Sequence, residues 1–159
     1  MILDERNEFA DAASVAAAAG TALIGDVIDL GLPARDMGMG QQLWLVITCA
    51  TEIITAGAAG TLKFQLVSDA QAAIATNGTA TVHLDSGDFV TDDSAANSTE
   101  LNAGEVIFAA PLPVQGKVYE RFLGILAVTA VTTTTAGAIN AFLTLDPPRG
   151  KKIYPEGAN

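Results

Sequence analysis

Apolar and polar residues alternate along most of this chain, and the alternation has a period of two. After Gly137, one side of the pattern carries Ile139, Ala141, Leu143 and Leu145, and the other carries Asn140, Phe142 and Thr144. A period of two is typical of a β-strand with two distinct faces. The end of the chain is therefore predicted to be a strand.

The stretch Phe122–Leu145 contains no Asp, Glu, Lys or Arg, although the chain is otherwise acidic. Its length and lack of charge satisfy the usual criterion for a membrane-spanning helix. The residue types favour strands instead, because Val128–Thr135 is β-branched almost throughout and Gly137 follows. We interpret the stretch as a β-hairpin of the core rather than as a spanning helix.

Further strands are predicted between turn-forming residues. Gln41–Ala50 is apolar on both faces, which indicates a central strand of a sandwich, covered on both sides. Thr61–Ser68 places Leu62, Phe64 and Leu66 on one face and polar residues on the other. The remaining predicted strands are Asp26–Leu30, Thr79–Leu84, Glu105–Ala110 and Lys117–Val131, and Asp85–Asn102 is predicted to be an exposed loop.

The two ends of the chain are less regular. Residues 1–25 form either an N-terminal arm or the first strand, and Ala12–Ala19 fits a short helix as well as an extended strand. Residues 146–159 contain three prolines, which exclude a central strand and predict an extended tail. About eight irregularly spaced strands predict a single all-β domain over residues 1–159: a two-sheet antiparallel sandwich, of the jelly-roll kind.

Composition excludes several functions. A formal charge of −10 over 159 residues argues against binding nucleic acid through a general basic surface. One cysteine, Cys49, allows no intrachain disulfide, and one Cys with one His is too few for a zinc site. The start MILDERNEF is charged and lacks an apolar segment, so we expect no secretory signal and a cytoplasmic place of synthesis.

Candidate catalytic and metal-binding residues are few. His83, Asp85 and Ser86 have the residue types of a hydrolytic triad, but neighbouring positions rarely provide its geometry. Cys49 lies mid-strand without an activating base, and is best explained as a small buried hydrophobe. The aspartates of the Asp85–Asp93 loop could meet around calcium, but their spacing is not that of an EF-hand. We therefore expect no enzyme, no cofactor and no metal.

The termini carry the more suggestive residues. Apolar side chains near the start and basic and aromatic ones near the end could dock onto neighbouring subunits; these candidate contact residues are Ile2, Leu3, Phe9, Arg149, Lys151, Lys152 and Tyr154. The alternative explanation is a pair of frayed ends without a function.

Four patterns occur in order over nearly the whole chain: MILDERNEFADAASV, DVIDLG, RDMGMGQQLWLVI and YERFLGI before a Thr-rich turn. In this the chain resembles the small jelly-roll cement proteins of tailed bacteriophage heads. The resemblance implies a dimer on the outside of the virion capsid, with the major capsid protein as partner and neither nucleic acid nor membrane. The alternative function is a carbohydrate- or receptor-binding β-sandwich of a phage particle, although one Trp and two Tyr offer few residues for sugar stacking.

Overall fold

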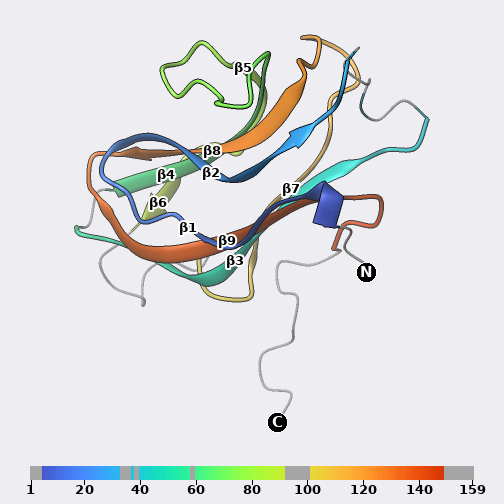
Figure 1. Ribbon diagram of the computed structural model, residues 1–159. Helices are drawn as coiled ribbons and strands as arrows, with labels where there is room; N and C mark the ends of the chain where they lie inside the picture. The colour runs from blue at the N-terminus through green and yellow to red at the C-terminus, as the bar shows by residue number, and fades with distance from the viewer. Residues whose placement is uncertain (1–4, 33–36, 38–39, 58–59, 92–100, 149–159) are drawn as a thin grey trace.

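Two antiparallel sheets stacked face to face form the protein in a computed structural model, which describes residues 5–32, 37, 40–57, 60–91 and 101–148 (Figure 1). The first sheet has the strand order β1-β9-β3-β7, with β1 at Glu8–Ser14, β9 at Thr134–Thr144, β3 at Trp44–Thr55 and β7 at Val106–Pro111. The second has the order β2-β8-β4-β5, with β2 at Gly20–Asp29, β8 at Phe122–Ala130, β4 at Gly60–Asp69 and β5 at Thr81–Asp85. A short strand, β6 (Phe89–Thr91), also pairs with β4, and one 3-10 turn, η1 (Glu5–Asn7), precedes β1.

The connections between these strands are those of a jelly roll. Leaving β6 aside, each strand is followed by one in the opposite sheet, except that β4 and β5 are neighbours in the same sheet. An eight-stranded double sheet built in this way is a jelly roll. The predicted all-β, two-sheet antiparallel sandwich is confirmed.

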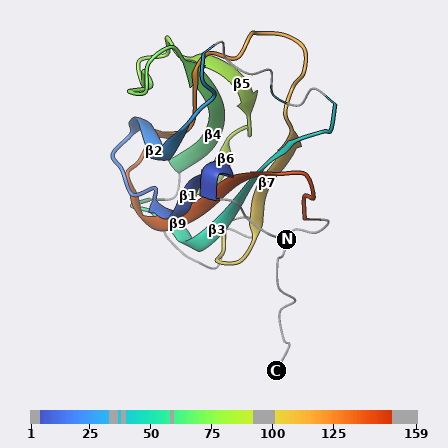
Figure 2. The ribbon, with the colours of Figure 1, turned by 45° about the vertical axis from the view of Figure 1, so that its right-hand side comes forward.

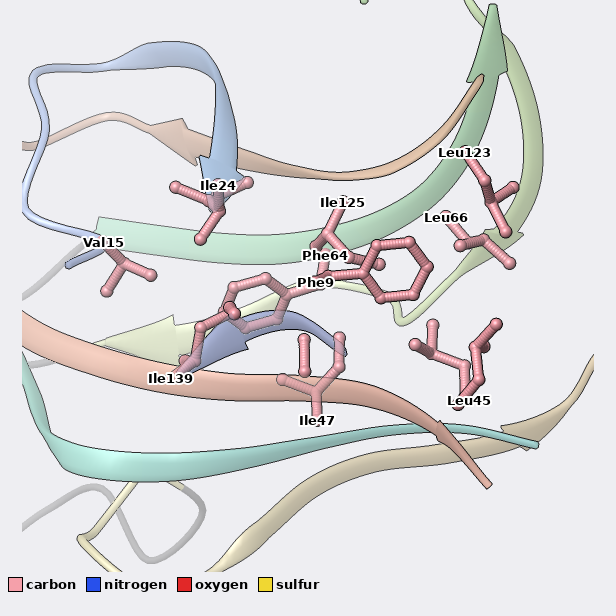
Figure 3. Close-up of a cluster of buried hydrophobic side chains, with 14 of the residues drawn as sticks. Phe9, Val15, Ile24, Leu45, Ile47, Phe64, Leu66, Leu123, Ile125 and Ile139 are labelled. Atoms are coloured by element: carbon pink, nitrogen blue, oxygen red, sulfur yellow. The ribbon is translucent and has the colours of Figure 1, made fainter. Parts of the chain in front are cut away.

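The core lies between the sheets. Figure 3 shows Phe9, Phe64 and Ile125 among the side chains that meet there, contributed by strands of both layers. Burying each such side chain contributes roughly 1.5–3 kcal/mol to folding. The central strand predicted at Gln41–Ala50 is confirmed in β3, which begins at Trp44, lies between β9 and β7, and is buried on both faces over Leu45–Cys49. In β4, Leu62, Phe64 and Leu66 point into the core as predicted.

The interpretation of Phe122–Leu145 as a hairpin is wrong in one respect. Its two strands exist, but β8 pairs with β2 and β4, whereas β9 pairs with β1 and β3. The inward side chains of β8 and β9 therefore face each other across the core, and the turn at Val131–Thr133 crosses between sheets. Gly137 lies within β9 rather than in a turn, beside Ile53 of β3. No helix in the described residues is long and apolar enough to span a membrane.

The N-terminal region is a pair of strands rather than an arm from residue 8 onward. β1 ends at Ser14, and Val15 and Ala17 then bond to Gly137 and Thr134 of β9, so extended structure replaces the alternative helix at Ala12–Ala19. β2 begins at Gly20, six residues before the predicted strand Asp26–Leu30, and a bulge separates its two halves.

Two further predictions need correction. Lys117–Arg121 is not part of β8, which begins at Phe122. The Tyr119 hydroxyl donates to the Pro113 carbonyl and the Glu120 N–H donates to Ser68 Oγ, so these groups do not form the backbone bonds of a strand. The polar interval Asp85–Asn102 is not wholly a loop, since it contains β6; its residues 92–100 lie outside the described residues.

The outer face of the second sheet carries a smaller apolar cluster. The β4–β5 connection folds over this face and buries Ile74 against Val67 and Leu126. Gly124 of β8 leaves room for it, because a Cβ at this position would lie 2.5 Å from Ile74 Cδ1. Asp69 holds the connection by accepting hydrogen bonds from the backbone N–H groups of Gln71 and Ala75.

Candidate docking end

One end of the sandwich gathers the segments most suited to binding. The start of β1 and the end of β9 lie there, together with the β2–β3, β4–β5 and β7–β8 connections. We call it the arm end, because the described chain both begins and finishes at it. In Figure 1 the start of β1, the end of β9 and the β2–β3 connection lie on the right-hand side of the molecule, and the β4–β5 connection (green) folds back over the top.

Exposed apolar side chains are concentrated at the arm end. Six large hydrophobic residues in the described residues are exposed, and four of them lie in the segments of this end: Leu32, Val114, Val118 and Leu145. The other two, Val90 and Val131, lie toward the opposite end. Because four of the six share one end, this end is our candidate for a protein-binding surface.

The β7–β8 connection, residues 112–121, is held at both of its ends. At the first end, the backbone N–H of Leu112 donates to the carbonyl of Leu43 at 2.8 Å, and Gln42 Nε2 donates to the carbonyl of Leu112. At the second end, Arg121 forms a two-point ion pair with Asp29, with N–O distances of 2.9 and 2.8 Å. The exposed residues Val114–Val118 are thus presented on a fixed base, which lowers the entropy lost on binding.

A partly buried polar network holds the middle of this connection. Ser68 Oγ accepts a hydrogen bond from the backbone N–H of Glu120 at 3.0 Å and lies 2.8 Å from His83 Nε2. The His83 ring stacks on Tyr119, whose hydroxyl donates to the carbonyl of Pro113 at 3.0 Å. Burial and the charge of Lys117 lower the pKa of His83, against an opposing effect of Glu120.

A hollow of about 150 Å³ opens beside this network. Its lining includes Met37, Pro113, Val114, Lys117, Val118 and Tyr119. Figure 2 shows the β7–β8 connection (orange) and the segment before β3 (cyan) on the same side of the molecule. A cavity of this size accommodates one benzene-sized group, so the hollow has room for a single apolar side chain.

The three residues of the suggested triad each bond to other groups in the structure. His83 bonds to Ser68, Asp85 accepts from Gln65 Nε2 and from the Gly87 N–H, and Ser86 Oγ donates to the Gly87 carbonyl. Ser68 is itself fully buried, so the Ser68–His83 pair is closed to a substrate.

Cys49 is buried, and its thiol donates toward the carbonyls of Thr51 and Leu101. Burial raises the pKa of the Cys49 thiol to about 12. A thiol with so high a pKa is a poor nucleophile at neutral pH. Within the described residues no group of three or more His, Cys, Asp or Glu is placed to hold a metal; Asp92 and Asp93 of the suggested calcium loop lie outside them.

Of the candidate contact residues, only Phe9 is described. It is 1% exposed and packs in the core, so its side chain holds β1 in place rather than forming a surface. Ile2, Leu3, Arg149, Lys151, Lys152 and Tyr154 lie outside the described residues. The sequence analysis did not identify the exposed Val114 and Val118 as contact residues. The prolines and glycine of the run PLPVQGK could have indicated an exposed loop there.

Comparison with known proteins identifies the class. The profile of the Bbp16 family, a family of phage proteins, matches residues 9–143, and the chain belongs to this family. The match extends from the second residue of β1 to the last residue but one of β9, and so covers nearly the whole sandwich. No curated protein matches the chain.

Proposed function

We propose that this protein is a capsid cement protein, which binds as a homodimer to the outside of the major capsid shell. Membership of a phage family and the jelly-roll fold support the proposal. The observation that carries it is the arm end, where four of the six exposed large hydrophobics of the described residues lie beside both ends of the described chain. In this proposal the protein acts by binding alone, without catalysis or a cofactor.

Stabilisation follows from mass action. A protein that binds the assembled shell and not its separated subunits stabilises the shell by its binding free energy at every site. A two-fold dimer would present two docking surfaces at once and raise the effective concentration of the second. Many modest contacts could then resist the internal pressure of packaged DNA.

The proposed surface can be tested by co-sedimentation with heads that lack the protein. We expect the wild type and Val90→Asp to bind equally, because Val90 is 72% exposed toward the opposite end. Leu32→Asp, whose side chain is 77% exposed at the arm end, should bind at least about tenfold more weakly, as expected when a charge enters an apolar interface. Equal binding of both variants would remove the arm end as the docking surface.

The alternative of a carbohydrate-binding module has less support. Sugar sites of this kind use exposed aromatic rings, and none of the exposed large hydrophobics in the described residues is aromatic. Binding to a sugar in a glycan screen, together with no co-sedimentation with heads, would favour that alternative.

A further inference from the structure

We propose that the hollow beside the β7–β8 connection receives the N-terminal segment of a second copy of this chain, with an apolar side chain of Ile2 or Leu3 inside it and Asp4 beside Lys117. This inference rests on the proposed dimer and names its contact. It begins with the hollow, whose described lining combines the apolar side chains of Met37, Val114 and Val118 with the polar ones of Gln115 and Lys117; its volume has room for one side chain.

Charge selects what can enter the hollow. Among the described residues of its lining Lys117 alone is charged; it is exposed and has no ion pair with any described residue. Glu120, the nearest acid in sequence, is already engaged by the Thr81 hydroxyl at 2.8 Å. A segment with an apolar side chain next to a carboxylate matches both parts of this lining, the apolar side chains and Lys117.

The chain itself contains such a segment. Ile2, Leu3 and Asp4 are consecutive, and the exposed Glu5 follows them. In a protein of net charge −10, two copies repel each other over most of their surfaces, so a contact between Lys117 and Asp4 is one of the few places where association gains electrostatically. Because η1 lies at the arm end, the segment leaves the described structure at the same end as the hollow.

The contact is suited to a reciprocal dimer. If each copy provides one N-terminal segment and one hollow, the two identical contacts close under a two-fold axis. The hydrogen bonds of Tyr119 and Glu120 fix the β7–β8 connection before binding. Most of the conformational entropy lost on binding is therefore that of the short N-terminal segment.

A cross-link between separate chains tests the contact directly, since the native Cys49 is buried and does not compete. One full-length chain carries Leu3→Cys, and a differently sized tagged chain carries Val118→Cys. Mixing them under mild oxidation should give a disulfide-linked pair of the two sizes, and the matched chain with Val90→Cys should give at least about tenfold less. No preference for position 118 over position 90 would overturn the proposal, as would a cross-link that forms only when both cysteines are in one chain.

A charge exchange provides a second test, read by sedimentation of the full-length protein over a range of concentrations. Asp4→Lys and Lys117→Glu should each weaken the dimer several-fold, and the double variant should recover most of the loss, as for a direct ion pair. A monomeric wild type, or single variants without effect, would contradict the proposal. Binding to heads is measured separately: loss of head binding by Val118→Asp with an unchanged dimer would assign the hollow to the capsid instead.

Discussion

The His83 ring stacks on the Tyr119 ring, with the centroids 4.0 Å apart and the planes inclined by 20°. The pair joins β5 to the β7–β8 connection, the long loop that crosses from one sheet to the other. Ser68 lies against the histidine from β4 and also binds the backbone N–H of Glu120. These contacts together position the loop that carries Val114, Lys117 and Val118 at the arm end.

The state of His83 should make the stability of the protein depend on pH. Ser68 Oγ accepts the Glu120 N–H and lies 2.8 Å from His83 Nε2, so the histidine sits in a partly buried hydrogen-bonded site. Burial and Lys117 hold the pKa of His83 below its usual 6.5, while Glu120 opposes them. Between the lowered pKa of the folded protein and the usual value of 6.5, the unfolded chain binds more protons than the folded one.

We therefore expect the contribution of His83 to be complete above pH 6.5 and to be lost as the pH falls from 6.5 through the lowered pKa. Urea unfolding between pH 7.5 and 5 measures this effect. His83→Gln, which does not titrate, should flatten the decline over that range. An unchanged slope in the variant would show that His83 is not the group responsible.

Removal of the Tyr119 hydroxyl should weaken the same loop. Tyr119→Phe keeps the stacked ring but deletes the hydrogen bond to the Pro113 carbonyl. The free energy of unfolding should fall by about 1 kcal/mol, the usual net value of one hydrogen bond. Amide exchange should also become faster within residues 112–121 and stay the same in β3. A uniform increase over all strands would instead indicate global destabilisation.

The Asp29–Arg121 ion pair predicts a second, more acidic transition. The hydrogen bonds that Asp29 accepts from Arg121 and from the Gly31 N–H lower its pKa from 3.8 to about 2. Because the folded pKa is the lower one, this stabilisation is present above pH 3.8 and is lost as the pH falls toward 2. Asp29→Asn should remove that part of the acid unfolding curve and leave the His83 range unaffected. A variant curve that matches the wild type below pH 3.8 would contradict this assignment.

Two glycines should respond differently to alanine. Gly25, at a φ of +65°, lies in the bulge of β2, where a Cβ would overlap the backbone carbonyl of Phe9. At Gly124 the obstacle is the movable end of Ile74. Gly124→Ala should cost on the order of 1–3 kcal/mol, as in overpacked cores, and less when combined with Ile74→Val. Gly25→Ala should cost more, because the backbone of β1 must move; thermal unfolding of both variants checks the order.

The sequence predicted the inward faces of the strands better than their partners. Alternation identifies that Ile139, Ala141 and Leu143 share a face, and these residues are buried in the core. It contains no information about the partner, so β8 and β9 could be taken for a hairpin although each pairs within its own sheet. Pairing in a jelly roll is set by contacts that are distant in sequence.

The candidate site was harder to predict for a related reason. Lys117–Arg121 continues the alternating pattern of β8, and only the bonds of Glu120 to Ser68 and of Tyr119 to Pro113 show that it is a loop. Those partners are 52 and 6 residues away, and no local pattern indicates them. The presence of several exposed apolar groups at the arm end likewise depends on topology, because Leu32 and Leu145 lie at the same end only through the order of the strands.

The stability of the capsid itself tests the central claim most directly. Heads that lack this protein are mixed with the purified full-length chain, separated from unbound protein and heated while shell disruption is followed by light scattering. The proposed cement function predicts that heads with the bound protein are disrupted at a higher temperature than bare heads, with a rise that saturates as the sites fill. No binding, or binding without a change in the disruption temperature, would contradict it.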